Sequence, residues 1–558
     1  MAVRVDFDLE MRTRDGVVLR ADVYRPEDSA AVPAIVLRTP YNKALRGNRF
    51  DGLHGVTAAK RGYAFVIQDV RGRWASEGEY TPISLTEGAD GYDCIEWVAA
   101  QPWCSGQVGM IGGSYESLVQ FMAAQEQPPS LGAICPQFSG DSRRGALMLD
   151  SILISWAAGQ ALDWVTKKAA EGVATDDDLA IVMETLHDPQ RFARWLPLCD
   201  MPLMKVGSLF TYAEMLQILR GVAGIQCDRI DVPVLMVGGW YDIDPLGSAQ
   251  IFSRLLVEAG ERCRAGSAVV WGPWEHCVTL ETIGERSFGQ QSSALNFGLA
   301  ELQLRFFDRH LKADADASVA GATWLVTGAN VWKTAETWPP PDTSWQTWHL
   351  SGGGGANGVD GDGRLSLEAP DEDREDVYTY DPADPVPSFG GRFFRVGGSL
   401  PGPFDQRRVE SRADVLVYTS APLDEALEVA GDARVALHLT TNVVDTDFVV
   451  KLCDVDPSGL SHNVSDNIVR MRWREGTDKP LVIEPDEPFE LVVDLSPIGH
   501  IFKQGHRMRL QVTSSNFPAY DRNMNTGHPE GTDAVGVKAV QRLAWGPATP
   551  SRLELQVL

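Results

Sequence analysis

Ser114 lies in a setting that suits a nucleophile. The run 112–115 (Gly-Gly-Ser-Tyr) joins a predicted strand at 107–111 to a predicted helix at 115–124. A serine on such a tight turn takes a strained backbone that lifts its hydroxyl clear of the sheet, and the next N–H faces a developing oxyanion. Glycine-rich turns after strands also bind phosphates, and Glu116 replaces the last glycine of the G-x-S-x-G pattern. By itself, the motif leaves both interpretations open.

Asp242 and His276 are the candidates for the acid and the base. Around a serine on such a turn, the partners follow in the order Ser, Asp, His. Asp242 comes shortly after a predicted strand at 232–237, and His276 follows another at 268–271. The carboxyl ends of such strands are where open α/β sheets build their sites. Alone, Asp242 is typical of a helix N-cap and His276 of an ordinary loop histidine. Their order and placement together predict a Ser-His-Asp triad.

The elements around these residues alternate between short apolar strands and amphipathic helices. Further strands are predicted at 33–37, 63–68 and 131–135, and a helix at 87–100. This alternation is typical of a parallel sheet covered by helices. The sequence therefore predicts an α/β fold that holds the three candidate residues at one edge of its sheet.

The pattern changes twice along the chain. The α/β domain is expected at 1–140 and again at 231–320, with a helical cap inserted at 141–230. From 321 to 558 the chain is rich in alternating strand patterns and turn residues, which is typical of a β-sandwich or jelly roll. The expected fold class is α/β, with a cap and a C-terminal β domain.

The composition argues against several classes of function. The 558 residues carry a formal net charge of −26, whereas nucleic-acid binding requires clustered Lys and Arg. The eight cysteines contain no Cys-x-x-Cys pair, so neither a metal nor another cofactor is expected. No window reaches the roughly 18 apolar residues of a membrane span, and the first residues lack an apolar signal core. A cytoplasmic protein that binds no membrane is expected, and homo-oligomer formation stays open.

Several motifs, in the same order, resemble those of the cocaine esterase-like (CocE/NonD) hydrolases, a family related to X-Pro dipeptidyl-peptidases and α-amino-acid ester hydrolases. The matching segments lie across nearly the whole chain, at 38–43, 69–78, 112–115, 239–242, 272–276 and 380–387. The resemblance implies an α/β-hydrolase core with an inserted helical cap and a C-terminal jelly roll. It also implies an oxyanion hole formed by the hydroxyl of Tyr41 and the backbone N–H of Tyr115.

The chain departs from the family's pattern at two positions. Ser117 stands where the nucleophile motif usually ends in glycine, and serine is small enough to keep the packing. Asp244 stands two residues after Asp242, where an aromatic residue is common and contributes to the acyl pocket. A carboxylate there suits a polar or cationic group of the substrate. A loop carboxylate that bonds N–H groups, or caps a helix starting near Pro245, explains the residue equally well.

Two tryptophans of the cap are candidate substrate contacts. Trp156 and Trp164 are eight residues apart and fall on one helical face. Such a pair suits the wall of an aromatic acyl pocket. A stripe that packs into the core of the cap is the favoured interpretation.

The expected reaction is acyl transfer to water. Ser114 attacks a carbonyl, His276 removes and later returns the proton, and Asp242 orients the histidine. A small-molecule ester is the favoured substrate. Cleavage of an amide by an acylase or aminopeptidase, and acyl transfer to another acceptor, are the alternatives. A catalytically inactive glycan-binding protein is the alternative from a different class, and it would need no such set of residues.

Overall fold

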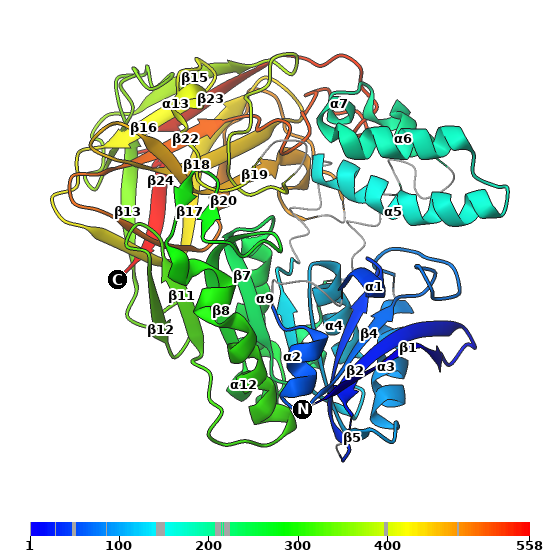
Figure 1. Ribbon diagram of the computed structural model, residues 1–558. Coiled ribbons are helices and arrows are strands. Elements are labelled where there is room, and N and C mark those ends of the chain that lie inside the picture. The colour runs from blue at the N-terminus through cyan, green and yellow to red at the C-terminus, as the bar shows by residue number, and fades with distance from the viewer. Residues whose placement is uncertain are drawn as a thin grey trace.

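The chain is seen in a computed structural model that describes residues 2–27, 30–46, 52–84, 86–140, 151–206, 214, 216, 224–395, 400–476 and 479–558. Figure 1 shows three parts: an α/β domain, a group of helices that includes α5, α6 and α7, and a β domain formed by the second half of the chain. The helical group lies beside the β domain and above the first strands of the α/β domain (Figure 1). This arrangement confirms the predicted fold class.

The α/β domain is built on a sheet that has ten strands in the described part of the chain. Their order is β1-β2-β4-β3-β5-β6-β7-β8-β11-β12. The strands are β1 (Val3–Arg12), β2 (Val18–Pro26), β3 (Val32–Thr39), β4 (Ala64–Asp69), β5 (Cys104–Gly113), β6 (Leu131–Gln137), β7 (Leu235–Tyr241), β8 (Ala268–Glu275), β11 (Ala322–Val326) and β12 (Val331–Ala335). From β4 to β11 the neighbours are parallel, so their carboxyl ends share one edge.

Helices cover both faces of this sheet. They are α1 (Lys43–Arg46), α2 (Gly55–Lys60), α3 (Thr86–Ala99), α4 (Tyr115–Gln125), α9 (Pro245–Glu258), α10 (Glu261–Gly266), α11 (Ala294–Phe297) and α12 (Leu299–Leu311). Apolar side chains of α3, α4 and α9 belong to one core with the sheet, and those of α2 and α12 belong to another. Every residue of β4, β6, β7 and β8 is buried, as parallel strands with two covered faces require.

The helical cap has a core of its own. It contains α5 (Ser151–Ala170), α6 (Asp176–His187), α7 (Pro189–Ala193) and the short turns η2 (Leu198–Asp200) and η3 (Pro202–Lys205). The turn η4 (Cys227–Arg229) packs instead into the core of the α/β domain. Val165, Val182 and Phe192 are among the buried residues that join its helices. A capping box between Thr175 and Asp178 starts α6, because each residue satisfies a backbone N–H of the other.

The β domain consists of twelve hydrogen-bonded strands among the described residues. They are β13 (Ser344–Ser351), β14 (Arg364–Ser366), β15 (Arg374–Tyr380), β16 (Leu416–Ser420), β17 (Leu427–Thr441), β18 (Asp447–Val455), β19 (Ser461–Arg470), β20 (Phe489–Asp494), β21 (Ile498–Phe502), β22 (Arg507–Thr513), β23 (Ala539–Trp545) and β24 (Arg552–Val557). The long strand β17 pairs with β20, β21, β23 and β24. One large apolar cluster that includes Leu437, Val450 and Leu510 fills this domain.

Two features of the sheet differ from the expectations. β1 and β2 form an antiparallel pair at one end of the sheet, which the apolar periodicity did not indicate. β11 and β12 lie beyond residue 320, where the β domain was expected to begin, yet they extend the first sheet. The reason is that β11 pairs in parallel with β8 and in antiparallel with β12.

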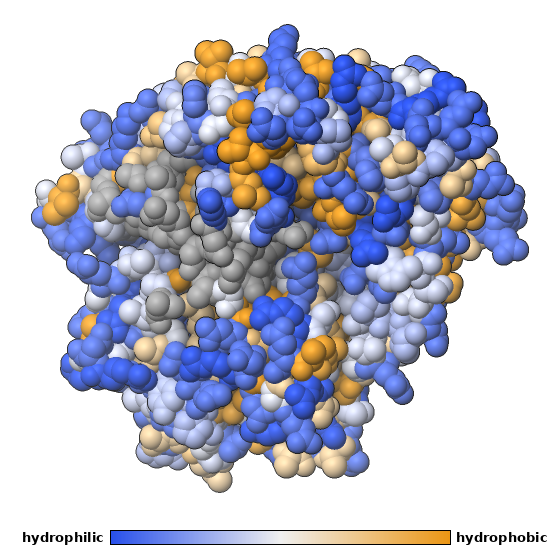
Figure 2. Space-filling view, turned by 180° about the vertical axis from the view of Figure 1, so that it is seen from behind, coloured by the Kyte–Doolittle hydropathy of each residue, from blue (hydrophilic) through white to orange (hydrophobic). Residues whose placement is uncertain are grey.

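Much of the visible surface is hydrophilic. Figure 2 shows a mostly hydrophilic face on which apolar residues are scattered in small groups. No helix in the described ranges combines the length and apolar character needed to cross a bilayer. All eight cysteines are free thiols.

A group of buried charges lies inside the β domain. The guanidinium of Arg470 contacts carboxylate oxygens of Asp447 at 2.9 Å, Asp521 at 3.2 Å and Glu530 at 3.2 Å. All four side chains are at most 8% exposed. Burial raises the pKa of Asp521 to about 7, although Arg470 opposes that shift. The arginine thus compensates several carboxylates that are largely shielded from water.

Replacing Arg470 with methionine is expected to destabilise the protein strongly. The variant would leave buried carboxylates without their cation, which costs about 3–5 kcal/mol of unfolding free energy. The matched control is Arg542→Gln, which breaks a surface pair with Glu375 and should cost less than about 1 kcal/mol. Urea unfolding of both variants measures the difference. Equal losses would show that burial does not govern the energy of these pairs.

Candidate active site

Ser114 lies on the predicted strand-to-helix turn, between the end of β5 and the start of α4. Its backbone has φ 62° and ψ −127°, a conformation that residues other than glycine rarely adopt. Gly112 has φ 145°, and a Cβ added there would lie 2.5 Å from the Cβ of Glu116. The turn therefore needs glycine at position 112, two residues before the serine, because a larger residue there would both clash and be strained.

The structure brings the three predicted residues into one hydrogen-bonded chain. His276 Nε2 lies 2.8 Å from Ser114 Oγ, and His276 Nδ1 lies 2.5 Å from Asp242 Oδ1. The three residues follow β5, β7 and β8, whose carboxyl ends share one edge of the sheet. With the imidazole proton on Nδ1, Asp242 accepts it and Nε2 can accept the serine proton. The arrangement can activate a hydroxyl for nucleophilic attack.

Aromatic rings and main-chain groups hold this histidine and its carboxylate. Asp242 is fully buried, and its Oδ1 also accepts the N–H of Ile243 at 2.6 Å. The ring of Phe138 lies 6.2 Å from the imidazole, and the ring of Phe394 lies 5.4 Å from it. Phe394 comes from the second half of the chain. No local motif signalled its approach.

Tyr41 lies beside Tyr115, the last of residues 112–115, a segment called the nucleophile turn after the predicted role of Ser114. Tyr41 comes two residues after β3, and its ring meets that of Tyr115 edge to face at 6.4 Å. Tyr115 is the first residue of α4, where an N–H has no carbonyl within its own helix to bind. Its phenol points elsewhere and donates to Glu87 at 2.6 Å. The geometry thus leaves the backbone of Tyr115, not its side chain, for a contact beside Ser114.

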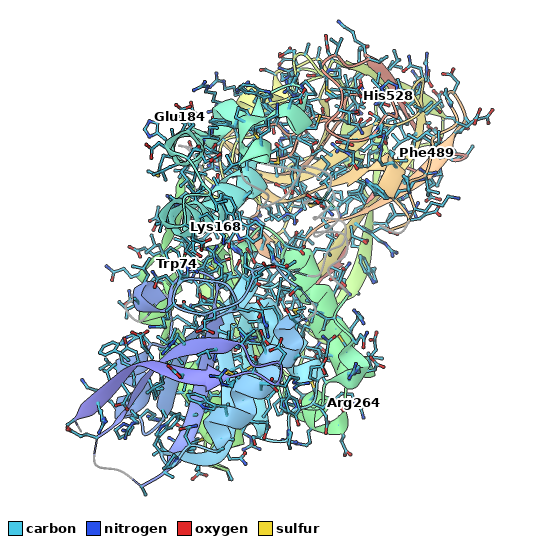
Figure 3. The ribbon with its side chains drawn as sticks, turned by 90° about the vertical axis from the view of Figure 1, so that its right-hand side faces the viewer. Trp74, Lys168, Glu184, Arg264, Phe489 and His528 are labelled. Atoms are coloured by element: carbon cyan, nitrogen blue, oxygen red, sulfur yellow. The ribbon has the colours of Figure 1, made fainter. Side chains whose placement is uncertain are left out.

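The segment 69–78, which the sequence offered only as a family motif, ties the Tyr41 loop to the cap. Arg73 Nε and Trp74 Nε1 both donate to the carbonyl of Pro40, at 3.1 and 2.9 Å. Arg73 also donates to the carbonyl of Gln160 in α5 at 2.9 Å, and its side chain is 2% exposed. In Figure 3, Trp74 and Lys168 lie where the α/β domain meets the cap, far from Arg264. The loop is therefore held from two sides.

Glu116 explains the departure from the G-x-S-x-G pattern. Its Oε1 accepts the hydroxyl of Thr39 at 2.8 Å, and its Oε2 accepts the N–H of Gly113 at 3.2 Å. The same Thr39 hydroxyl oxygen accepts the N–H of Tyr41 at 3.0 Å. The carboxylate thus links the nucleophile turn to the loop that carries Tyr41. Ser117, the other departure, donates to the carbonyl of Ser114 at 2.7 Å.

The two tryptophans separate in the structure. Trp156 belongs to the cluster around Tyr115, and its Nε1 donates to the Tyr41 hydroxyl at 3.4 Å. Trp164 packs against the apolar core of the cap. Their helical spacing placed them on one face, but α5 extends past the site, so only Trp156 reaches the candidate residues.

Asp244 caps a helix. Its Oδ1 accepts the N–H of Gly247 at 2.9 Å, and the residue occupies the N-cap of α9. Its other oxygen faces Gly140, where an added Cβ would lie 2.6 Å away. Asp244 also contributes to raising the pKa of the buried Arg392, although Asp466 contributes more. The helix N-cap that the sequence left as an alternative is present, and contact of Asp244 with a substrate stays a prediction.

A small pocket is lined in part by the turn that carries Ser114. Its volume is about 50 Å³, and Leu37, Leu53, Gln137 and Cys277 are among its lining residues. Within the described ranges, no three His, Cys, Asp or Glu side chains are placed to hold a metal ion.

The fold and the site together define an α/β hydrolase whose serine stands on the nucleophile turn. The family model for X-Pro dipeptidyl-peptidase (S15 family) matches residues 15–278, and that for the X-Pro dipeptidyl-peptidase C-terminal non-catalytic domain matches residues 314–554. A cocaine esterase from Rhodococcus sp. (strain MB1 Bresler) is 34% identical over 572 residues, which cover 98% of this chain and 97% of the esterase. The chain belongs to the CocE/NonD family of serine esterases, which confirms the resemblance.

Two solved structures are similar over the whole chain. An α-amino acid ester hydrolase has a TM-score of 0.76 and 25% identity, covering 100% of this chain and 97% of its own. An aminopeptidase from the marine sediment archaeon Thaumarchaeota archaeon has a TM-score of 0.75 and 26% identity, covering 100% and 96%. The cap and the β domain are therefore shared with these relatives.

Substitutions of Asp244 distinguish its role as the N-cap residue of α9 from a contact with the substrate. Asp244→Ala removes the N-cap hydrogen bond of α9 and is expected to lower the unfolding free energy by about 1 kcal/mol. Asp244→Asn keeps a good cap without the charge, so its stability should stay close to that of the parent protein. Thermal unfolding measures both. If the alanine variant unfolds like the parent protein, the N-cap hydrogen bond of Asp244 contributes nothing to stability. If kcat/KM for amino-bearing esters falls in the asparagine variant, the carboxylate also meets the substrate.

Proposed function

We propose that this protein hydrolyses a small-molecule carboxylic ester through an acyl-enzyme, with Ser114 as nucleophile, His276 as general base and Asp242 as the residue that orients the histidine. The observation that carries the proposal is the continuous chain from Ser114 Oγ to His276 Nε2 at 2.8 Å and from His276 Nδ1 to Asp242 at 2.5 Å. The family membership of the chain supports the same reaction.

The reaction has two halves of the same form. Ser114 Oγ attacks the ester carbonyl while His276 takes its proton, and Asp242 stabilises the imidazolium. As the tetrahedral intermediate collapses, the C–O bond to the alcohol breaks and His276 protonates the leaving oxygen. Water then attacks the acyl-enzyme, His276 accepts its proton and returns it to Ser114. The products are the alcohol and the carboxylic acid.

The oxyanion is assigned to two donors. The N–H of Tyr115 is placed by the start of α4, and the hydroxyl of Tyr41 is placed by the loop that Arg73, Trp74 and Glu116 hold. Donors that are already oriented stabilise negative charge in the transition state without reorganisation. The Trp156 N–H at the Tyr41 oxygen adds to this orientation, because it fixes the phenol from the cap side.

Amide cleavage is the second candidate. It is favoured by the family match to X-Pro dipeptidyl-peptidases and by the structural likeness to an aminopeptidase. The same residues would serve, since an amide differs from an ester chiefly in the leaving group that His276 must protonate. Comparing kcat/KM for p-nitrophenyl esters with that for aminoacyl p-nitroanilides decides between the two. We expect the esters to be preferred.

Ser114→Ala is expected to abolish hydrolysis and labelling by a fluorophosphonate, because both require the serine oxygen. The fold should be unchanged, since alanine removes only the oxygen that faces His276. Ser117→Ala is the matched control: its hydroxyl bonds the carbonyl of Ser114 and is not the attacking group. Mass spectrometry of the labelled protein locates the adduct. An adduct on Ser114→Ala would refute the assignment of the nucleophile.

Tyr41→Phe is expected to lower kcat by about 10²–10³ with little change in KM, because one of two oxyanion donors is lost. Labelling of Ser114 should persist at a reduced rate, since the N–H of Tyr115 remains. Steady-state kinetics on the best p-nitrophenyl ester gives both constants. An unchanged kcat would exclude Tyr41 from the oxyanion hole.

A further inference from the structure

Glu275, the last residue of β8, carries a carboxylate that the proposed reaction leaves without a role. It directly precedes His276 and is 1% exposed. Its Oε1 accepts hydrogen bonds from Nε of Arg395, at 3.1 Å, and from Nη2 of the same residue. Its Oε2 is buried without a hydrogen-bond partner among the described residues. Because a buried carboxylate is costly unless a cation compensates it, Arg395 is what keeps this group charged.

Arg395 reaches Glu275 from the other half of the chain. It follows β15 and lies within residues 314–554, which match the domain described as non-catalytic in the related peptidases. Its neighbour Phe394 covers the imidazole of His276, with ring centroids 5.4 Å apart. Two consecutive residues of the β domain thus contact two consecutive residues at the end of β8.

Several groups lie near this pair and the imidazole in the described part of the chain. The pKa of Glu275 lies above its ordinary value, because burial outweighs the lowering effects of Arg395 and His276. The described groups that contact the His276 side chain include the Asp242 carboxylate, the Ser114 hydroxyl and the uncharged rings of Phe138 and Phe394, and Cys277 follows His276 in the sequence. In the described part of the site, Glu275 is therefore a second carboxylate within electrostatic range of the imidazole.

The ion pair of Glu275 and Arg395 has a net electrostatic effect on His276. The side chain of Arg395 is 46% exposed, whereas that of Glu275 is 1% exposed. Water and salt screen an exposed charge more than a buried one. The negative end of the pair thus acts on His276 more strongly than the positive end. Such a field favours the imidazolium that forms when the serine proton is taken.

We propose that Glu275 is a positioning residue that acts through His276: together with Asp242 it stabilises the imidazolium, while Arg395 of the β domain keeps Glu275 ionised. The β domain, through Arg395, thereby sets the pH range in which the histidine works as a base. This inference rests on the proposed function, because it requires His276 to be the general base.

The pH profile of kcat/KM tests the proposal. In Glu275→Gln the shape of the side chain is kept and the charge is lost, so His276 gives up its proton more readily. The midpoint of the acid limb should move to lower pH by about half a unit or more. At neutral pH, kcat should fall severalfold while KM stays unchanged, because the lost charge acts mainly on the imidazolium.

The Arg395→Gln variant tests the second part of the proposal, that Arg395 keeps Glu275 ionised. It leaves Glu275 buried without its cation, so the carboxyl binds a proton at higher pH than in the parent protein. The pH profile of kcat/KM for Arg395→Gln should gain a second step. It should follow the profile of Glu275→Gln at low pH, where Glu275 is protonated, and approach the profile of the parent protein at high pH. In the double variant the step should vanish, leaving the profile of Glu275→Gln. If Glu275→Gln folds poorly, the presence or absence of a second step in the Arg395→Gln profile, compared with the parent profile, still tests the proposal.

Glu428→Gln is the matched control. Glu428 of β17 pairs with Lys333 of β12 at 2.7 Å, which is another ion pair between the β domain and the first sheet. Breaking it should leave the midpoint of the acid limb unchanged. A Glu275→Gln profile that coincides with the parent profile would overturn the proposal. If the parent protein neither hydrolyses esters nor labels at Ser114, the proposed function fails instead, before this inference is tested.

Discussion

The site depends on one strained turn. Ser114 can present its hydroxyl to His276 only because the backbone between β5 and α4 takes a positive φ of 62°. That conformation costs energy, so the surroundings must impose it. Gly112 removes the clash that any side chain would make with Glu116, and the carboxylate of Glu116 binds the N–H of Gly113. The hydrophobic sheet beneath supplies the rigid support.

Around this turn, each part of the molecule contributes a different contact. The parallel sheet places Asp242 and His276 at the same edge as Ser114. The cap reaches Tyr41 through Trp156, and the β domain reaches the histidine through Phe394. A rigid arrangement of this kind suits catalysis by preorganised groups, because little reorganisation remains for the transition state. It also means that the β domain contacts the candidate site directly.

Buried charged side chains occur in several parts of the molecule, and groups of opposite charge or hydrogen-bond partners compensate them. Arg470 holds three carboxylates in the β domain, and Arg73 holds Asp163 and two carbonyl groups where the cap meets the Tyr41 loop. Such pairs give orientation more than stability, since desolvation offsets much of their attraction. At Tyr41 the orientation serves the candidate oxyanion hole. Inside the β domain it serves the packing of the strands.

The sequence by itself determined the fold class, the family and the candidate residues Ser114, Asp242 and His276, because each follows an apolar strand that local periodicity reveals. It left Asp244 undecided between a helix cap and a substrate contact, and it could not separate Trp156 from Trp164. Only the tertiary structure placed Asp244 on α9, Trp156 on Tyr41, and Arg395 on Glu275. The Asp244 contact is local, but the sequence pattern fits either role. The contacts of Trp156 with Tyr41 and of Arg395 with Glu275 join residues far apart in sequence, so packing decides them and local pattern does not.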